Sequence, residues 1–123
     1  MKIITIIEGG KFLTEDFEGK NYPLEKLQEK VGGYVELAQR KVGRKYYDLW
    51  IHGEGRLIGL PPTLITENED FRGNVVITRS KGERTIGLTE QEAEEVLKEL
   101  EVVLVNDGRN LHFVMHSEKS FKW

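Results

Sequence analysis

Apolar residues recur at helical spacing in two stretches of the chain, and the first is "NYPLEKLQEKVGG". Leu24, Leu27 and Val31 are separated by three and four positions, so they fall on one face of a helix. Pro23 suits the first turn, and the glycine pair after Val31 suits a left-handed end. The pattern predicts a helix at roughly residues 23–31.

The second helical stretch, "LTEQEAEEVLKELE", carries the clearest start signal in the chain. Thr89 is followed three residues later by Glu92, the spacing of a capping box in which each side chain satisfies a backbone N–H group near the helix start. Alanine, valine and leucine then form one apolar stripe. We predict a helix at roughly residues 90–101.

Runs rich in β-branched and aromatic residues, separated by glycine-containing turns, are typical of strands joined as hairpins. They predict nine strands, at residues 2–8, 11–19, 34–41, 46–52, 56–60, 74–80, 84–88, 101–105 and 111–116. With two helices among so many hairpins, we expect an α+β fold in which both helices pack on a largely antiparallel, mixed sheet.

Length limits the number of domains, because 123 residues supply one hydrophobic core but not two. We expect a single globular domain over residues 1–123, with residues 102–123 forming a C-terminal hairpin extension. An exposed strand edge in that hairpin would favour pairing with a second copy, so a homodimer is one expected assembly.

The stretch "HGEGRLIGLPPTLI" at residues 52–65 resembles a phosphate-binding loop at first sight. A dinucleotide loop needs G-x-G-x-x-G after a strand and before a helix, whereas Gly53, Gly55 and Gly59 give a different spacing and lead into two prolines. We therefore interpret the glycines as a hairpin tip. Residues 61–73 lack periodicity, which is typical of a long and often functional connection.

Composition excludes several kinds of site. Cysteine is absent, which removes disulfides, thiol nucleophiles and thiolate zinc sites. No apolar run is long enough to cross a bilayer and the N-terminal residues do not form a signal peptide, so we expect a cytoplasmic protein that does not bind membranes. Charged residues are mostly glutamate and lysine, a bias that a thermophilic source would give.

Neither a catalytic set nor a cofactor site is evident. His112 and His116 would lie about 13 Å apart on a strand, too far to share a metal ion. None of the three serines lies in a nucleophile elbow. We therefore expect no catalytic residues, no metal and no cofactor.

The net charge of -3 argues against binding of nucleic acid by the whole surface, but one turn is strongly basic. It contains Arg40, Lys41, Arg44 and Lys45, and two tyrosines and a tryptophan follow. Cations interleaved with aromatic rings can follow phosphates while bases stack, so this turn is a candidate nucleic-acid site. A solvated hairpin tip is the alternative interpretation.

Strand alternation predicts a second candidate surface on the two middle strands. If the helices cover the face that carries Val35, Leu37, Leu49 and Ile51, the remaining side chains share the opposite face. These are Tyr34, Glu36, Asp48, Trp50 and His52. Such a mixture of aromatic, carboxylate and imidazole groups suits a polar ligand or a partner protein; solvated side chains, or a face covered by the C-terminal hairpin, are the alternatives.

Four segments in order, "VGGYVE", "HGEGRLIGLPPT", "GNVVI" and "LTEQE", carry a family resemblance. The chain resembles an uncharacterised family of small phage, plasmid and mobile-element proteins with the pattern V-G-G-Y-I-E, N-E-x-G-x-L-x-G-L-P-x-N, G-x-x-x-I and Leu-Thr. His52 and Thr63 stand where that family tends to have asparagine, and Gly53 replaces an acidic residue. The resemblance brings no known activity; it implies that Thr63 belongs with the candidate ligand-binding residues.

These observations rank three functions. The first is a small binding or regulatory module that contacts a protein or small ligand through the Tyr34/Glu36/Trp50/His52 face and residues 61–73. The second is nucleic-acid binding by the basic turn. The third is a small hydrolase-type enzyme with Glu36 and His52 as an acid/base pair, which requires the two groups to lie within hydrogen-bonding reach.

Overall fold

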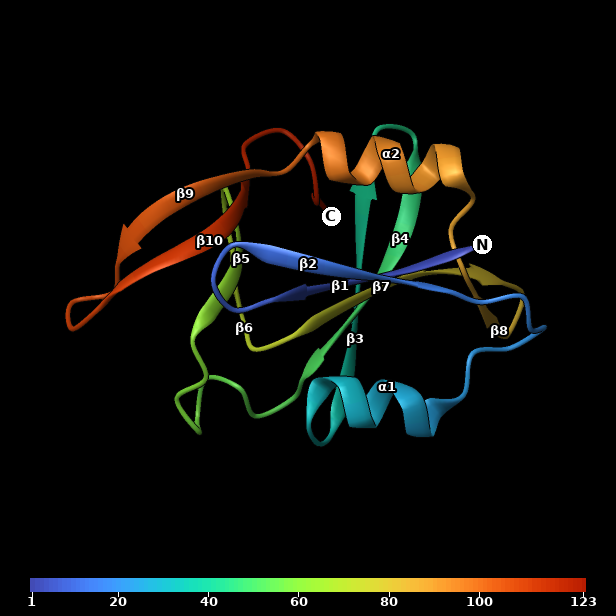
Figure 1. Ribbon diagram of the computed structural model, residues 1–123, viewed down its shortest axis with the longest axis horizontal. Helices are drawn as coiled ribbons and strands as arrows, with labels where there is room; N and C mark the ends of the chain where they lie inside the picture. The colour runs from blue at the N-terminus through green and yellow to red at the C-terminus, as the bar shows by residue number, and fades with distance from the viewer.

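A computed structural model describes residues 1–123 and has two helices and ten strands in two sheets, which confirms the α+β class (Figure 1). The helices are α1 (Leu24–Val31) and α2 (Glu90–Lys98). The strands are β1 (Lys2–Ile7), β2 (Lys11–Asp16), β3 (Val35–Val42), β4 (Lys45–His52), β5 (Pro62–Thr66), β6 (Asp70–Arg72), β7 (Val75–Lys81), β8 (Arg84–Ile86), β9 (Glu101–Asn106) and β10 (Leu111–Ser117).

The first sheet is antiparallel, with its strands in the order β2-β1-β7-β4-β3 and with β8 paired to β7. The second sheet has the order β6-β5-β10-β9, and its β5–β10 pair is parallel. β3 and β6 are therefore edge strands of different sheets, a position that matters for the site described below.

Side chains on both faces of the central strands of the first sheet are buried. In β1 the four residues from Ile3 to Ile6 are all buried, and in β7 so are the four from Val75 to Thr78. A strand buried on both faces favours apolar residues at successive positions. Three of the four buried residues in each run are accordingly isoleucine or valine, and the fourth is threonine.

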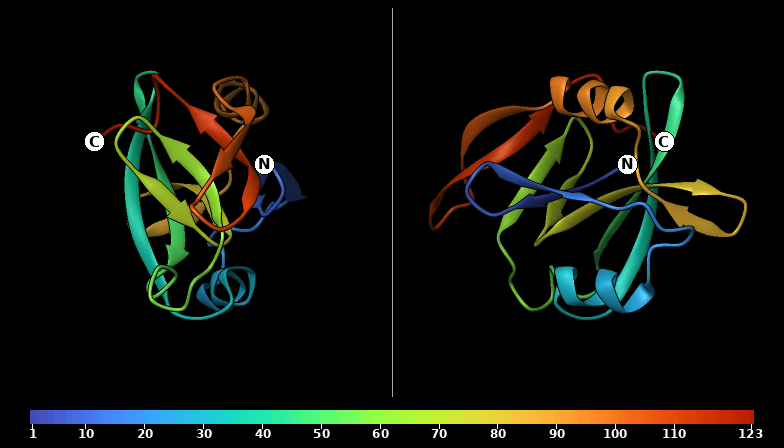
Figure 2. Two further views of the ribbon diagram at one scale, coloured as in Figure 1. Left: turned by 90° about the vertical axis from the view of Figure 1, so that its left-hand side faces the viewer. Right: turned by 45° about the vertical axis from the view of Figure 1, so that its right-hand side comes forward.

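The two helices lie on opposite sides of the first sheet, as all three views show (Figures 1 and 2). α1 packs through Leu27 and Val31 against Ile3 and Val76. On the other face, Val96 of α2 joins a larger core to which both sheets contribute. The prediction that both helices cover one face is therefore wrong, because the inner strands require cover on each side. Neither helix is long and apolar enough to span a membrane.

Both helix starts and the end of α1 follow the sequence signals closely. α1 follows Pro23 and ends at Gly32, whose φ of 87° is left-handed and whose N–H donates to the carbonyl of Gln28. α2 begins with the predicted capping box, in which Thr89 and Glu92 bond each other's backbone N–H groups. It ends at Lys98 rather than near 101, because β9 begins at Glu101.

The glycine-rich stretch after β4 is a compact turn and not a hairpin tip. Residues 53–59 contain no strand, and the Ile58 and Leu60 N–H groups donate back to Glu54 and Gly55. β4 pairs with β3 and β7, whereas the next strand, β5, belongs to the second sheet. The predicted hairpin and the strand at 56–60 are therefore wrong: the turn carries the chain from one sheet to the other.

Residues 61–73 are also more regular than predicted, because they contain β5 and β6 paired as an antiparallel hairpin. Thr63 lies at a register shift between Pro62 and Leu64, is 1% exposed, and donates its hydroxyl to the Gly73 carbonyl at 2.5 Å. The Thr63 hydroxyl is therefore already bonded within the β5–β6 hairpin, whereas the family resemblance implied that it would contact a ligand.

The predicted C-terminal hairpin is present as β9 and β10, but its inner part belongs to the core. Val114, Met115 and Phe121 are each at most 5% exposed. β10 is the strand that joins β9 to β5, so the second sheet depends on it.

Replacing Glu92 with glutamine should make unfolding easier at neutral pH. Burial tends to raise the pKa of Glu92, but the Thr89 N–H, Lys45 and Arg79 together lower it, with the two cations 3.2 and 3.1 Å from its carboxylate. A lowered folded-state pKa gives stability that is present above the unfolded-state pKa and is lost on acidification. Glutamine keeps the capping pattern, so the change isolates the charge.

We expect Glu92→Gln to lower the unfolding free energy by about 1–3 kcal/mol at pH 7, measured by urea denaturation. The difference from the unsubstituted protein should shrink on acidification, starting at the ordinary glutamate pKa of about 4.3 and ending below the lowered pKa of folded Glu92. Glu94→Gln, on the exposed face of the same helix, should change stability by less than about 0.5 kcal/mol. Equal stability of Glu92→Gln and the unsubstituted protein at pH 7 would contradict this role.

Candidate functional site

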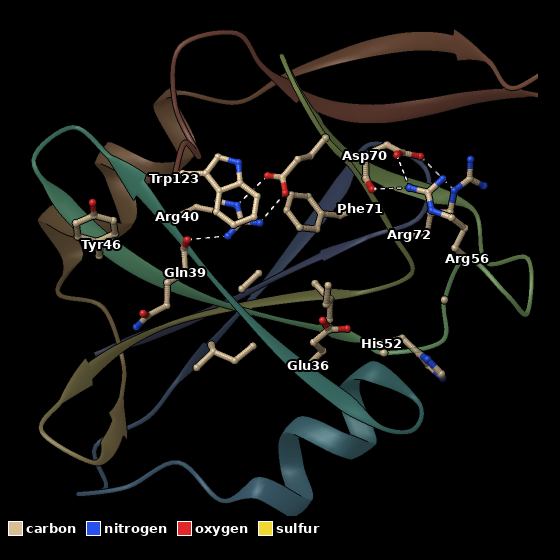
Figure 3. Close-up of a pocket in the computed structure, with 16 residues that line it drawn as sticks. Glu36, Gln39, Arg40, Tyr46, His52, Arg56, Asp70, Phe71, Arg72 and Trp123 are labelled. Carbon is tan, nitrogen blue, oxygen red and sulfur yellow. Dashed lines mark hydrogen bonds and ion pairs between the residues drawn. The ribbon is translucent and has the colours of Figure 1, made fainter.

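A groove of about 750 Å³ lies where the edges of the two sheets approach each other (Figure 3). β3 and the end of β4 form its floor, β6 and the 53–56 turn form one wall, and Trp123 closes one end. We call it the β3 groove. A volume of several hundred cubic ångströms is typical of ligand sites.

One end of the β3 groove is formed around Arg40, which is 5% exposed. Its guanidinium forms a two-point ion pair with Glu69, with N–O distances of 2.7 and 2.5 Å, and also donates to the Gln39 carbonyl. The guanidinium carbon lies 3.6 Å from the centre of the Trp123 ring. This one side chain therefore joins the edge of the first sheet to the β5–β6 turn and to the C-terminal residue.

The other end contains a second charged group centred on Asp70. Arg56 and Arg72 contact different oxygens of its carboxylate, at 2.5 and 3.2 Å. Burial tends to raise the pKa of Asp70, but hydrogen bonds and charge from the two arginines lower it below its usual range. All three arginines in the groove are thus paired with carboxylates.

Glu36 is the one groove carboxylate that forms no side-chain hydrogen bond or ion pair among the contacts of the structure. Its side chain is exposed and borders the groove (Figure 3). The groove therefore offers one free negative charge, with aromatic rings and paired charges around it.

His52 does not form the expected acid/base pair with Glu36. The antiparallel register pairs His52 with Val35 and Glu36 with Ile51, so the two functional side chains start on opposite faces of the sheet. His52 Nδ1 accepts the Glu54 N–H at 3.0 Å. A Cβ on Gly33 would lie 2.7 Å from His52 Nε2, so Gly33 gives the ring its space. No bond joins the two side chains.

The predicted shared surface is wrong for the same reason. Each strand alternates as expected, but Trp50 pairs with Leu37 and not with Glu36, so Trp50 and Asp48 face α1. Asp48 is 2% exposed and accepts hydrogen bonds from Gln39 and Ser80.

The two remaining aromatic members of that surface have different environments. Trp50 packs against the α1 cluster and donates its Nε1–H to the Thr78 hydroxyl at 2.9 Å. Tyr34 is 75% exposed and does not line the groove. Of the candidate ligand-binding residues, the groove brings together only Glu36 and His52.

The basic turn does not present four free cations. Arg40 is paired with Glu69, and Lys45 contacts Glu92 at 3.2 Å. Lys41 lies 5.9 Å from the centre of the Tyr46 ring, and Arg44 is exposed at the turn. Two of the four cations are therefore used inside the protein.

Sequence reasoning missed most of the groove. Glu69, Asp70 and Arg72 lie in residues 61–73, which the sequence predicts to be a connection without periodicity, and no motif singles out Arg56 or Trp123. The alternation of charged and aromatic residues in Asp70, Phe71 and Arg72 is the signal that could have identified β6. The two pairings that complete the site join residues 29 and 14 positions apart, which local patterns do not reveal.

Replacing Arg40 with methionine should destabilise the protein strongly, because it leaves the Glu69 carboxylate without its partner at a mostly buried position. We expect a loss of about 2–4 kcal/mol in unfolding free energy, measured by urea denaturation. The matched control Arg44→Met changes an exposed arginine of the same turn and should cost less than about 0.5 kcal/mol. Similar losses for the two variants would show that the Arg40–Glu69 pair does not hold the groove together.

Comparison with known proteins adds a family but no activity. No curated protein and no solved structure gives a significant match. Residues 1–101 match a family described as a domain of unknown function, which confirms the expected membership of an uncharacterised family and leaves β10 and most of β9 outside the match. Since this match covers most of the sequence, the chain belongs to the DUF3846 family of domains of unknown function.

Proposed function

We propose that the protein is a binding module that accepts an extended peptide segment of a partner protein along the edge of β3. The segment would add a strand to the first sheet, and every second side chain would enter the β3 groove. In this mode of recognition, main-chain hydrogen bonds supply affinity and pockets for alternate side chains supply specificity. The observation that carries the proposal is a strand edge, without a paired strand from Val35 to Gln39, that opens directly onto a groove.

The hydrogen bonds of Lys41 show which backbone groups of β3 point away from β4. Its N–H donates to the Lys122 carbonyl at 2.6 Å and its carbonyl accepts from Phe121 at 2.8 Å, both on the side away from β4. Because inward and outward groups alternate along an antiparallel edge, the N–H groups of Val35, Leu37 and Gln39 also point outward. This edge already forms one isolated bridge with the C-terminal residues, through Lys41 and Lys122, which supports its ability to pair with another segment.

The groove wraps around this edge. Leu37 and Gln39 are among its lining residues although their side chains lie on the α1 face, opposite Trp50 and Asp48. Their main chain therefore borders the groove. A strand added here would place side chains beside Glu36 on one face and beside Leu37 on the other.

The charges in the groove indicate which peptides would fit. Glu36 is free, whereas Asp70 and Glu69 are already paired with arginines. A lysine or arginine of the peptide opposite Glu36 would gain an ion pair, while Phe71 and Trp123 offer apolar contacts farther along. We infer a preference for basic and apolar residues at alternate positions.

Peptide binding is favoured over the other two functions by the same geometry. The Glu36–His52 pair that hydrolysis would need is not assembled, and two of the four cations of the basic turn are paired internally. A phage or mobile-element origin and a cytoplasmic location remain predictions from the sequence; a partner protein of the host would fit them.

A phage-displayed library of random heptapeptides, selected on the immobilised full chain, tests the proposal. We expect enriched peptides with a basic residue in an alternating pattern, and their binding is then measured by fluorescence anisotropy. Leu37→Pro removes the outward N–H but no bond to β4, and proline is tolerated at such edge positions. It should weaken binding about tenfold or more, because a peptide carbonyl is left without its donor.

Leu37→Ala is the matched control, since it shortens the same side chain but keeps the N–H group. Its affinity should stay within about twofold of the unsubstituted protein. Peptides that bind Leu37→Pro and Leu37→Ala equally well would overturn strand addition at β3. So would a library that yields no enrichment over an unrelated immobilised protein.

A further inference from the structure

The β9–β10 hairpin extends beyond the rest of the molecule (Figure 1). It presents an apolar face to solvent. The register places Leu104 opposite Phe113 and Val102 opposite Met115, so these side chains share one face. The exposed fractions of Val102, Leu104 and Phe113 are 52%, 54% and 56%. Clustered apolar exposure of this kind marks an interaction surface.

The outer edge of β9 has none of the features that normally prevent strand pairing. β9 is the last strand of its sheet, and its ladder with β10 has no bulge. From Val102 to Asn106 it contains no charged residue and no proline. An exposed edge of this type is a template for a further strand.

The turn of the hairpin shows which backbone groups of β9 point outward. The Asp107 N–H donates to the Asn110 carbonyl at 3.1 Å, which makes these two residues a hydrogen-bonded pair. Pairs alternate along an antiparallel ladder, so Asn106, Leu104 and Val102 have N–H and carbonyl groups that face away from β10. These groups are available to another strand.

We propose that the partner at this edge is a second copy of the chain, with the two β9 strands pairing antiparallel about a two-fold axis at Val103. In that arrangement Val102 lies opposite Leu104 of the partner subunit, and the outward backbone groups of both residues are satisfied. The two second sheets become one continuous sheet across the axis, and the exposed apolar faces of both hairpins lie side by side.

We propose a second copy of the chain as the partner because the outer edge of β9 is complementary to itself. Antiparallel pairing about a two-fold axis at Val103 places Val102 of each subunit opposite Leu104 of the partner subunit, so the apolar side chains of both strands lie on the same face. Moving the axis to Leu104 would instead place Glu101 opposite the like-charged Asp107 of the partner subunit, which is unfavourable.

Sedimentation equilibrium of the full chain measures the assembly directly. We expect a mass of twice 14.2 kDa for the unsubstituted protein and the mass of a single chain for Leu104→Lys, since a lysine at the edge disfavours strand pairing. The control Leu57→Lys changes a residue that is 88% exposed in the 53–59 turn and should leave the dimer intact. Circular dichroism melting verifies that both variants are folded.

Cysteine cross-linking tests the register, because the chain has no cysteine of its own. Val103→Cys places two thiols across the two-fold axis, where Cα atoms of a non-hydrogen-bonded pair are about 4.5 Å apart, within the range of a disulfide. It should form a covalent dimer on mild oxidation. Val105→Cys, on the same face of β9, lies opposite residue 101 of the partner subunit and should not.

A protein that sediments as a single chain at concentrations of several hundred micromolar would overturn the proposal. A dimer that persists in Leu104→Lys would overturn it too, since the interface would then lie elsewhere. Equal cross-linking of Val103→Cys and Val105→Cys would exclude the two-fold axis at Val103. None of these outcomes bears on peptide binding at β3, which lies in the other sheet.

Discussion

The structure depends on the burial of both faces of β1 and β7 at the centre of the first sheet. Ile3 and Val76 on one face, and Ile4 and Ile77 on the other, have no exposed surface. A sheet that is apolar on both sides must be covered twice. α1 covers one face, and α2 together with the second sheet covers the other. Layer order and the positions of the free edges follow from this requirement.

The candidate site lies at the edge of the first sheet, where the second sheet no longer covers it. β3 is the last strand of its sheet, and its inward side chains, Glu36, Ala38 and Arg40, lie at the boundary of the second sheet. Arg40 forms a two-point ion pair with Glu69 across this boundary and so links the two sheets. Glu36, two residues before Ala38, has no such partner among the hydrogen bonds and ion pairs of the structure. The same strand therefore contributes one charged residue to an ion pair between the sheets and leaves another without a partner.

Local patterns predicted the fold well and the site poorly. Pro23, Gly32 and the Thr89–Glu92 pair define both helices, because capping is decided within a few residues. Side-chain alternation along β3 and β4 was also predictable. Which residue of β4 lies opposite Glu36 was not, because that depends on the turn between the strands. The Arg40–Glu69 and Arg56–Asp70 pairs depend on how two sheets pack, which no local window contains.

The parallel pairing of β10 with β5 has a consequence for how the chain acquires its structure. Met115 lies opposite Leu64 in that ladder, although about fifty residues separate them in the sequence. Contacts of such long range form slowly, since a large loop must close first. During synthesis, the residues that match the family are made before β10, so Leu64 has no neighbour on that side. Until β10 is in place the nascent domain presents an open sheet edge, a state that chaperones commonly protect.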